Sequence, residues 1–124
     1  MQNDNEKFKN EFKKRLYKFV LRLIKFIDSI DRKDPTSRIV GDQLLRSGTS
    51  VLANYIEAKS ASSTKDFINF FNHSLKSANE SKMWIALLRD SGKGNPKELD
   101  YLLSELTEIA NVIATSVMTM KGKR

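Results

Sequence analysis

The polar side chains whose types and spacing suit catalysis or a hydrogen-bonded network lie on two stripes in the middle of the chain. The first, at spacings of four, four and three residues, consists of Arg46, Ser50, Asn54 and Glu57. The second, at spacings of four, three and four, consists of His73, Ser77, Glu80 and Trp84. Such spacings place each stripe on one face of a helix. The stripes are either two solvated faces or, where they meet within or between subunits, one polar network in which every buried charge must be paired.

The residue types give little support for catalysis. His73 is the only histidine and the chain has no cysteine, so nucleophilic chemistry of the Ser–His–Asp kind would depend on this one residue. A di-iron bundle needs Glu-x-x-His pairs, but Met83 stands three residues after Glu80 and Ser60 stands three after Glu57. Without cysteine there is also no thiolate zinc site. We therefore expect no enzyme activity, no metal and no cofactor.

The charge balance points to an anionic partner. The chain has 22 Lys and Arg against 15 Asp and Glu, a formal net charge of +7. Two groups could contact phosphates: an N-terminal stripe of Lys14, Lys18, Arg22 and Lys25, and a C-terminal patch of Lys121, Lys123 and Arg124. The phenylalanines near the stripe belong to the predicted core face, so we expect backbone contacts with little sequence preference. An ordinary solvated helix face is the alternative interpretation.

Helical periodicity dominates the rest of the pattern. In the first segment, apolar residues recur every three or four positions at Phe8, Phe12, Leu16, Phe19, Leu23, Phe26 and Ile30. Similar patterns predict helices at 5–33, 37–59, 64–91 and 96–120.

Cap signals support the predicted boundaries. Thr36 or Ser37 is expected to cap the second helix. The third opens with a capping box from Ser63, and Gly92 follows its end. Asn95 precedes Pro96 and Glu98 at the start of the fourth helix, a pattern typical of helix N-termini. 

No stretch alternates apolar and polar residues with the period of a strand. We therefore predict an all-α protein with a single domain over 1–124, folded as an up-down-up-down four-helix bundle. The polar N-terminus lacks the apolar core of a secretory signal, and no apolar run approaches the roughly 20 residues that cross a bilayer. We expect no membrane association and a cytoplasmic location, with which the absence of cysteine is compatible.

The run from Gln43 to Ala58 resembles the signature of the 23S rRNA intervening-sequence proteins, a family of four-helix bundles. Segments 65–72 and 98–117 are similar to parts of its third and fourth helices, so the resemblance covers about residues 8–120. The family's polar positions are matched by Arg46, Ser50, Asn54, Glu57, Ser77 and Glu80. Leu52 replaces a family proline and Ala58 a family glycine, which predicts a straighter second helix with a less sharply defined end.

The resemblance implies assembly rather than catalysis. Known members form homopentamers, and a related branch serves diversity-generating retroelements as a basic pentamer that binds nucleic acid and a reverse transcriptase. No catalytic residues are known for the family. We therefore expect a homo-oligomer, of five subunits if the family pattern applies, that binds RNA or DNA. The alternative is a protein-interaction scaffold, or an accessory subunit of a nucleic-acid enzyme such as a reverse transcriptase.

Overall fold

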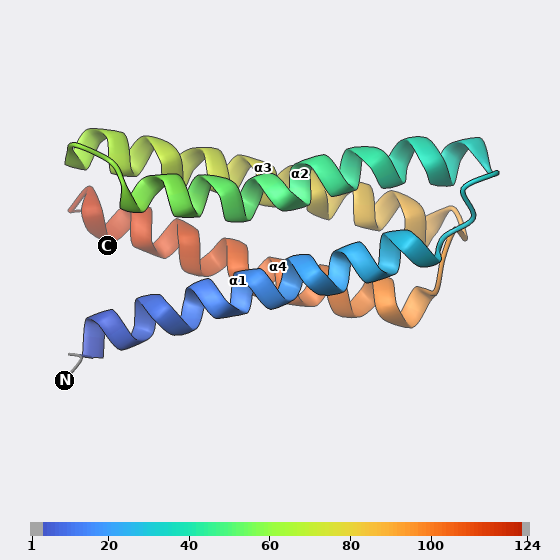
Figure 1. The fold of residues 1–124 in the computed structure, drawn as a ribbon, viewed down its shortest axis with the longest axis horizontal. Helices are drawn as coiled ribbons and strands as arrows, with labels where there is room; N and C mark the ends of the chain where they lie inside the picture. The colour runs from blue at the N-terminus through green and yellow to red at the C-terminus, as the bar shows by residue number, and fades with distance from the viewer. Residues whose placement is uncertain (1–3, 123–124) are drawn as a thin grey trace.

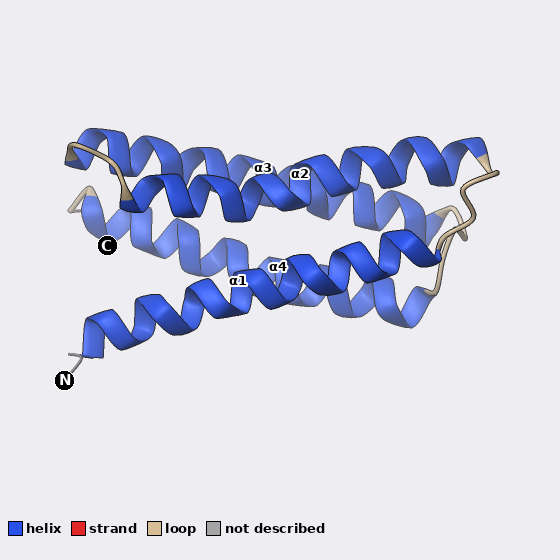
Figure 2. Ribbon diagram, in the orientation of Figure 1, coloured by secondary structure: helices blue, strands red, loops and turns tan. Residues whose placement is uncertain are grey.

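The computed structural model describes residues 4–122 as four helices joined by short turns, with no strand in that range (Figure 2). The helices are α1 (Asp4–Ser29), α2 (Pro35–Lys59), α3 (Thr64–Asp90) and α4 (Pro96–Met120). Helices that follow one another along the chain run in opposite directions (Figure 1). The α2–α3 turn, the start of α1 and the end of α4 lie at one end of the bundle, and the other two turns lie at the opposite end (Figure 1). The predicted up-down-up-down four-helix bundle is confirmed.

Apolar side chains from all four helices form one core. Leu16, Leu44, Ile85 and Leu106 are completely buried, one from each helix. The expectation that Phe8 joins this core is wrong, because its side chain is 54% exposed. Its ring stacks on that of Phe12, and the N-terminal part of α1 diverges from α4 (Figure 1).

The first two helices have different ends from those expected. α1 stops at Ser29 instead of residue 33, because the next residues form a turn in which the backbone N–H of Lys33 donates to Asp31 Oδ1 at 2.9 Å. Asp34, rather than Thr36 or Ser37, caps α2, and Pro35 occupies its first turn. Proline suits this position because an N–H in the first turn has no partner within the helix. α2 then continues without a break to Lys59.

The last two helices lie within one residue of their expected bounds. Ser63 caps α3 by accepting a hydrogen bond from the N–H of Asp66 at 3.1 Å. Gly92, after the end of α3, has a φ of +73°, which glycine adopts without steric cost. Asn95 caps α4 and accepts from the N–H groups of Lys97 and Glu98.

Small residues on α2 allow its neighbours to approach closely. A Cβ atom at Gly41 would lie 2.7 Å from Ile30 Cδ1, and one at Gly48 would collide with the side chain of Leu23. In the antiparallel alignment of α1 and α2, Ile30 therefore lies beside Gly41 and Leu23 beside Gly48. None of the helices within 4–122 is both long enough and apolar enough to cross a bilayer.

Candidate functional site

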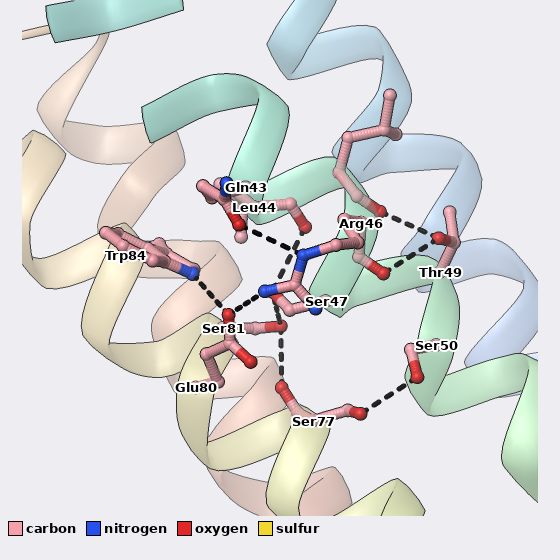
Figure 3. A network of polar contacts seen from close by, with 11 residues as sticks. Gln43, Leu44, Arg46, Ser47, Thr49, Ser50, Ser77, Glu80, Ser81 and Trp84 are labelled. Carbon is pink, nitrogen blue, oxygen red and sulfur yellow. Dashed lines mark hydrogen bonds and ion pairs between the residues drawn. The ribbon is translucent and has the colours of Figure 1, made fainter. Parts of the chain in front are cut away.

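The two polar stripes meet on the outer face between α2 and α3, within one subunit (Figure 3). The hydroxyl of Ser77 on α3 donates to Ser50 Oγ on α2 at 2.9 Å. Asn54 Nδ2 donates to the same oxygen at 2.9 Å and to the Ser50 carbonyl at 3.0 Å. The Ser77–Ser50 contact joins side chains that are 27 positions apart, which is possible only because α3 folds back along α2.

An ion pair extends this network along the helices (Figure 3). Arg46 Nη2 on α2 contacts Glu80 Oε2 on α3, and Arg46 Nε donates to Gln43 Oε1 at 3.0 Å. The indole Nε1 of Trp84 donates to the same Glu80 oxygen at 2.9 Å. The Arg46 side chain is 57% exposed and that of Glu80 33% exposed, so this is a surface network and avoids most of the desolvation cost of a buried pair.

Beneath it lies a layer of buried serines that the sequence analysis did not single out. The hydroxyls of Ser47 and Ser81 are 2.7 Å apart, and Ser81 Oγ donates to the Ser77 carbonyl at 2.8 Å. Ser74 Oγ donates to the Val51 carbonyl on α2 at 2.7 Å. The sequence feature that could have predicted this layer is the occurrence of small residues at core-facing positions of both helices. These serines let the two backbones pack closely while their hydroxyls stay hydrogen-bonded.

Two residues of the predicted stripes, Glu57 and His73, take no part in this network. Glu57 is exposed, and its side chain makes no hydrogen bond or ion pair within the described part of the chain. His73 is exposed beside an open groove of about 660 Å³, which Asn54, Lys76 and Ser77 also line. Residues 4–122 contain no group of three or more His, Asp or Glu side chains that could hold a metal ion. The network thus positions α3 against α2, and nothing in it pairs a nucleophile with a base.

The basic stripe of α1 divides into two chemically distinct groups. Its arginine, Arg22, donates to both carboxylate oxygens of Glu98 on α4, at 2.7 and 2.9 Å. The guanidinium also lies 3.5 Å from the centre of the Tyr101 ring, a cation–π contact. The hydrogen bonds from Arg22 lower the pKa of Glu98 below its ordinary value. Arg22 therefore serves the α1–α4 contact.

The lysines of the stripe are placed differently. Lys14, Lys18 and Lys25 are exposed, and none of them forms an ion pair with any residue from 4 to 122. Lys121, at the end of α4, is also exposed. The other two members of the predicted C-terminal patch, Lys123 and Arg124, lie outside the described residues.

The comparisons with known proteins agree on one family. The family model described as 23S rRNA-intervening sequence protein matches residues 9–115. A crystal structure of a protein of unknown function from the S23 ribosomal protein family of Bacteroides thetaiotaomicron is 30% identical and superposes with a TM-score of 0.79. The match covers 86% of this chain and 97% of that one. No curated protein matches the chain. Because the family model spans most of the sequence, this chain belongs to the 23S rRNA-intervening sequence protein family.

Proposed function

We propose that the protein is a non-enzymatic, cytoplasmic homo-oligomer that binds RNA or another nucleic acid through the exposed lysines of α1. The strongest support is the difference between the arginines and the lysines of that helix. Its arginines pair with glutamates of α4, whereas Lys14, Lys18 and Lys25 have no carboxylate partner among the described residues. Unpaired ammonium groups attract phosphates as point charges and read no base pattern. Binding should therefore depend on salt more than on sequence.

Exposed apolar residues support the homo-oligomer. Tyr17, Leu21 and Ile24 follow one another at spacings of four and three on α1 and are 57%, 51% and 37% exposed. Ile56, on the neighbouring helix α2, is 42% exposed. Single exposed apolar side chains are common, but three on one helical face favour a protein contact. We assign this face to a second copy of the chain, with five copies as the family resemblance implies. Repetition of the lysine face would then increase affinity by avidity.

Fluorescence anisotropy with a structured RNA and a single-stranded DNA, measured over a range of salt concentrations, tests the binding. The double variant Lys18→Gln/Lys25→Gln should bind more weakly, and the slope of log K against log salt should fall in magnitude by about 1.4 on a single strand. Lys33→Gln/Lys97→Gln is the matched control, because it removes the same charge from exposed positions at the end of the bundle where α4 begins. Absence of binding at low salt, or equal losses in the two variants, would overturn the proposal.

Light scattering coupled to size exclusion tests the assembly. The wild-type chain should elute with several times the 14.2 kDa mass of one chain. Leu21→Glu should dissociate it, while Met118→Glu, a change at a similarly exposed site on α4, should not. A monomeric wild type at micromolar concentration would contradict the homo-oligomer, and a stable complex with a different protein would assign the face to that partner instead.

A further inference from the structure

A group of three lysines gathers where α1 begins and α2 ends. Lys9 and Lys13 are one turn apart on α1, and Lys59 is the last residue of α2. The register set by Leu23 against Gly48 places Lys59 opposite the turn of α1 that carries the other two. Partial burial, followed by repulsion from Lys13 and Lys9, lowers the pKa of Lys59 below its ordinary value. Lys59 therefore lies close enough to both lysines of α1 to be repelled by their charge.

An aromatic cluster holds the backbones beneath these lysines in place. Tyr55 is only 4% exposed, and its ring packs against Phe12 of α1 and Phe71 of α3 at centroid distances of 5.3 and 5.5 Å. Its hydroxyl donates to the Lys9 carbonyl at 3.4 Å. Lys59 Nζ lies 5.2 Å from the centre of the same ring. The packing of these aromatic rings thus holds the backbones of the three lysines close together. The repulsion between their like charges reduces the stability of the fold.

Within residues 4–122, these lysines have no ion-pair partner. None of the ion pairs between described residues involves Lys9, Lys13 or Lys59. At the opposite end of the bundle, two basic side chains do have acidic partners: Arg32 pairs with Asp42, and Lys93 with Asp34. Exposed lysines elsewhere, such as Lys33 and Lys97, also lack an ion pair among the described residues, but Lys9, Lys13 and Lys59 lie together where two helices meet. 

We propose that Lys9, Lys13 and Lys59 form a binding site for closely spaced phosphate groups. The phosphates could belong to the backbone of a nucleic-acid strand, in which case the inference rests on the proposed function. A free polyphosphate presents the same chemistry. Phosphates placed among the three lysines would replace mutual repulsion with attraction. The site is distinct from Lys14, Lys18 and Lys25, because it joins two helices instead of following one.

The double variant Lys13→Gln/Lys59→Gln tests this site, with Lys33→Gln/Lys97→Gln again as the control of equal charge. The first measurement is thermal unfolding at low salt, with and without sodium tripolyphosphate. The wild type and the control should be stabilised by tripolyphosphate, and the cluster variant should lose most of that shift. Without the anion, the cluster variant should be at least as stable as the wild type, because a repulsive contact has been removed. A shift of equal size in all three proteins would overturn the site.

The second measurement is anisotropy with a single-stranded DNA. The cluster variant should bind at least about tenfold more weakly at low salt, with a slope of log K against log salt smaller by about 1.4. If it binds like the wild type while Lys18→Gln/Lys25→Gln does not, the proposed function stands and the cluster site is wrong. If the wild type binds no nucleic acid but the tripolyphosphate shift depends on the cluster, the phosphate site stands and the proposed function is wrong.

Discussion

The guanidinium of Arg15 on α1 donates two hydrogen bonds to the carboxylate of Glu105 on α4, from Nε at 2.7 Å and from Nη2 at 2.8 Å. The same Nη2 also reaches Glu108 at 3.1 Å. These hydrogen bonds lower the pKa of Glu105 below its ordinary value. Two turns further along, Arg22 repeats the arrangement with Glu98. The contact between α1 and α4 thus has an ordered polar edge of arginine–glutamate pairs.

Removal of the Glu105 charge should weaken this edge. Glu105→Gln keeps the shape and one acceptor but loses the ionic, two-point contact, so the free energy of unfolding should fall by about 0.5–1 kcal/mol. Urea unfolding followed by circular dichroism measures the change. Glu108→Gln is the control and should cost less, because Glu108 makes a single contact and its side chain is 63% exposed. The difference should shrink in 1 M salt; a difference that persists unchanged would argue against an electrostatic origin.

Gly48→Ala should destabilise the bundle even though alanine favours helix. A Cβ atom at this position collides with the Leu23 side chain, which is completely buried and has no space to move into. We expect a net loss of about 1–2 kcal/mol, as overpacking outweighs the gain in helix propensity. Gly41→Ala makes the same change on the same helix, but its neighbour Ile30 lies at the end of the bundle and can adjust, so it should cost less. Equal or increased stability of Gly48→Ala would show that α1 and α2 can separate at this point.

Stability should decrease in acid, in part through Asp34. Its carboxylate accepts from the N–H and hydroxyl of Ser37 at 3.0 and 2.8 Å and from Lys93 Nζ at 3.2 Å, and these bonds lower its pKa below the ordinary value of an aspartate. Because the folded pKa is the lower one, the stabilisation is fully present above the unfolded pKa and is lost as the pH falls from there through the folded pKa. The unfolding temperature should therefore drop between about pH 5 and pH 3.

The variant Asp34→Asn distinguishes the effect of the Asp34 charge from its effect as the N-cap of α2. Asp34→Asn still offers a side-chain oxygen to the start of α2, so it should fold well but show a shallower decrease in acid. Asp34→Ala loses the cap and should be less stable at every pH. Glu98 and Glu105, whose pKa values are also lowered, account for the slope that remains in Asp34→Asn. If Asp34→Asn and the wild type have the same slope, the pKa of Asp34 is not perturbed by folding.

The buried serine pair should show energetic coupling. Ser81→Ala removes the partner that lies 2.7 Å from Ser47 Oγ and should cost about 1 kcal/mol. In the double variant Ser47→Ala/Ser81→Ala no hydroxyl is left without its partner, so the combined loss should be smaller than the sum of the two single losses. Thermal or urea unfolding of the four proteins completes the cycle. Additive losses would mean that the two hydroxyls do not depend on each other.

Much of the fold could be predicted because its signals are local. The spacing of Leu16 and Leu23, and the placement of Asn95 and Gly92, reflect the helical repeat and the need to satisfy the ends of helices. These signals act over a few residues, so the amino-acid order suffices to read them. They were less reliable around Asp34, where a turn and a cap compete for the same residues.

The amino-acid order alone is enough to predict four amphipathic helices, the polar stripes of α2 and α3, and the excess of positive charge. It could not show that Arg22 is engaged by Glu98 while Lys18 remains unpaired, because those partners lie 76 positions apart in the chain. Nor could it bring Lys59 beside Lys13, or separate Glu57 from Arg46 and Glu80. Only the tertiary structure decides such matters, because the partner of a charged side chain depends on which helices pack together and in what register.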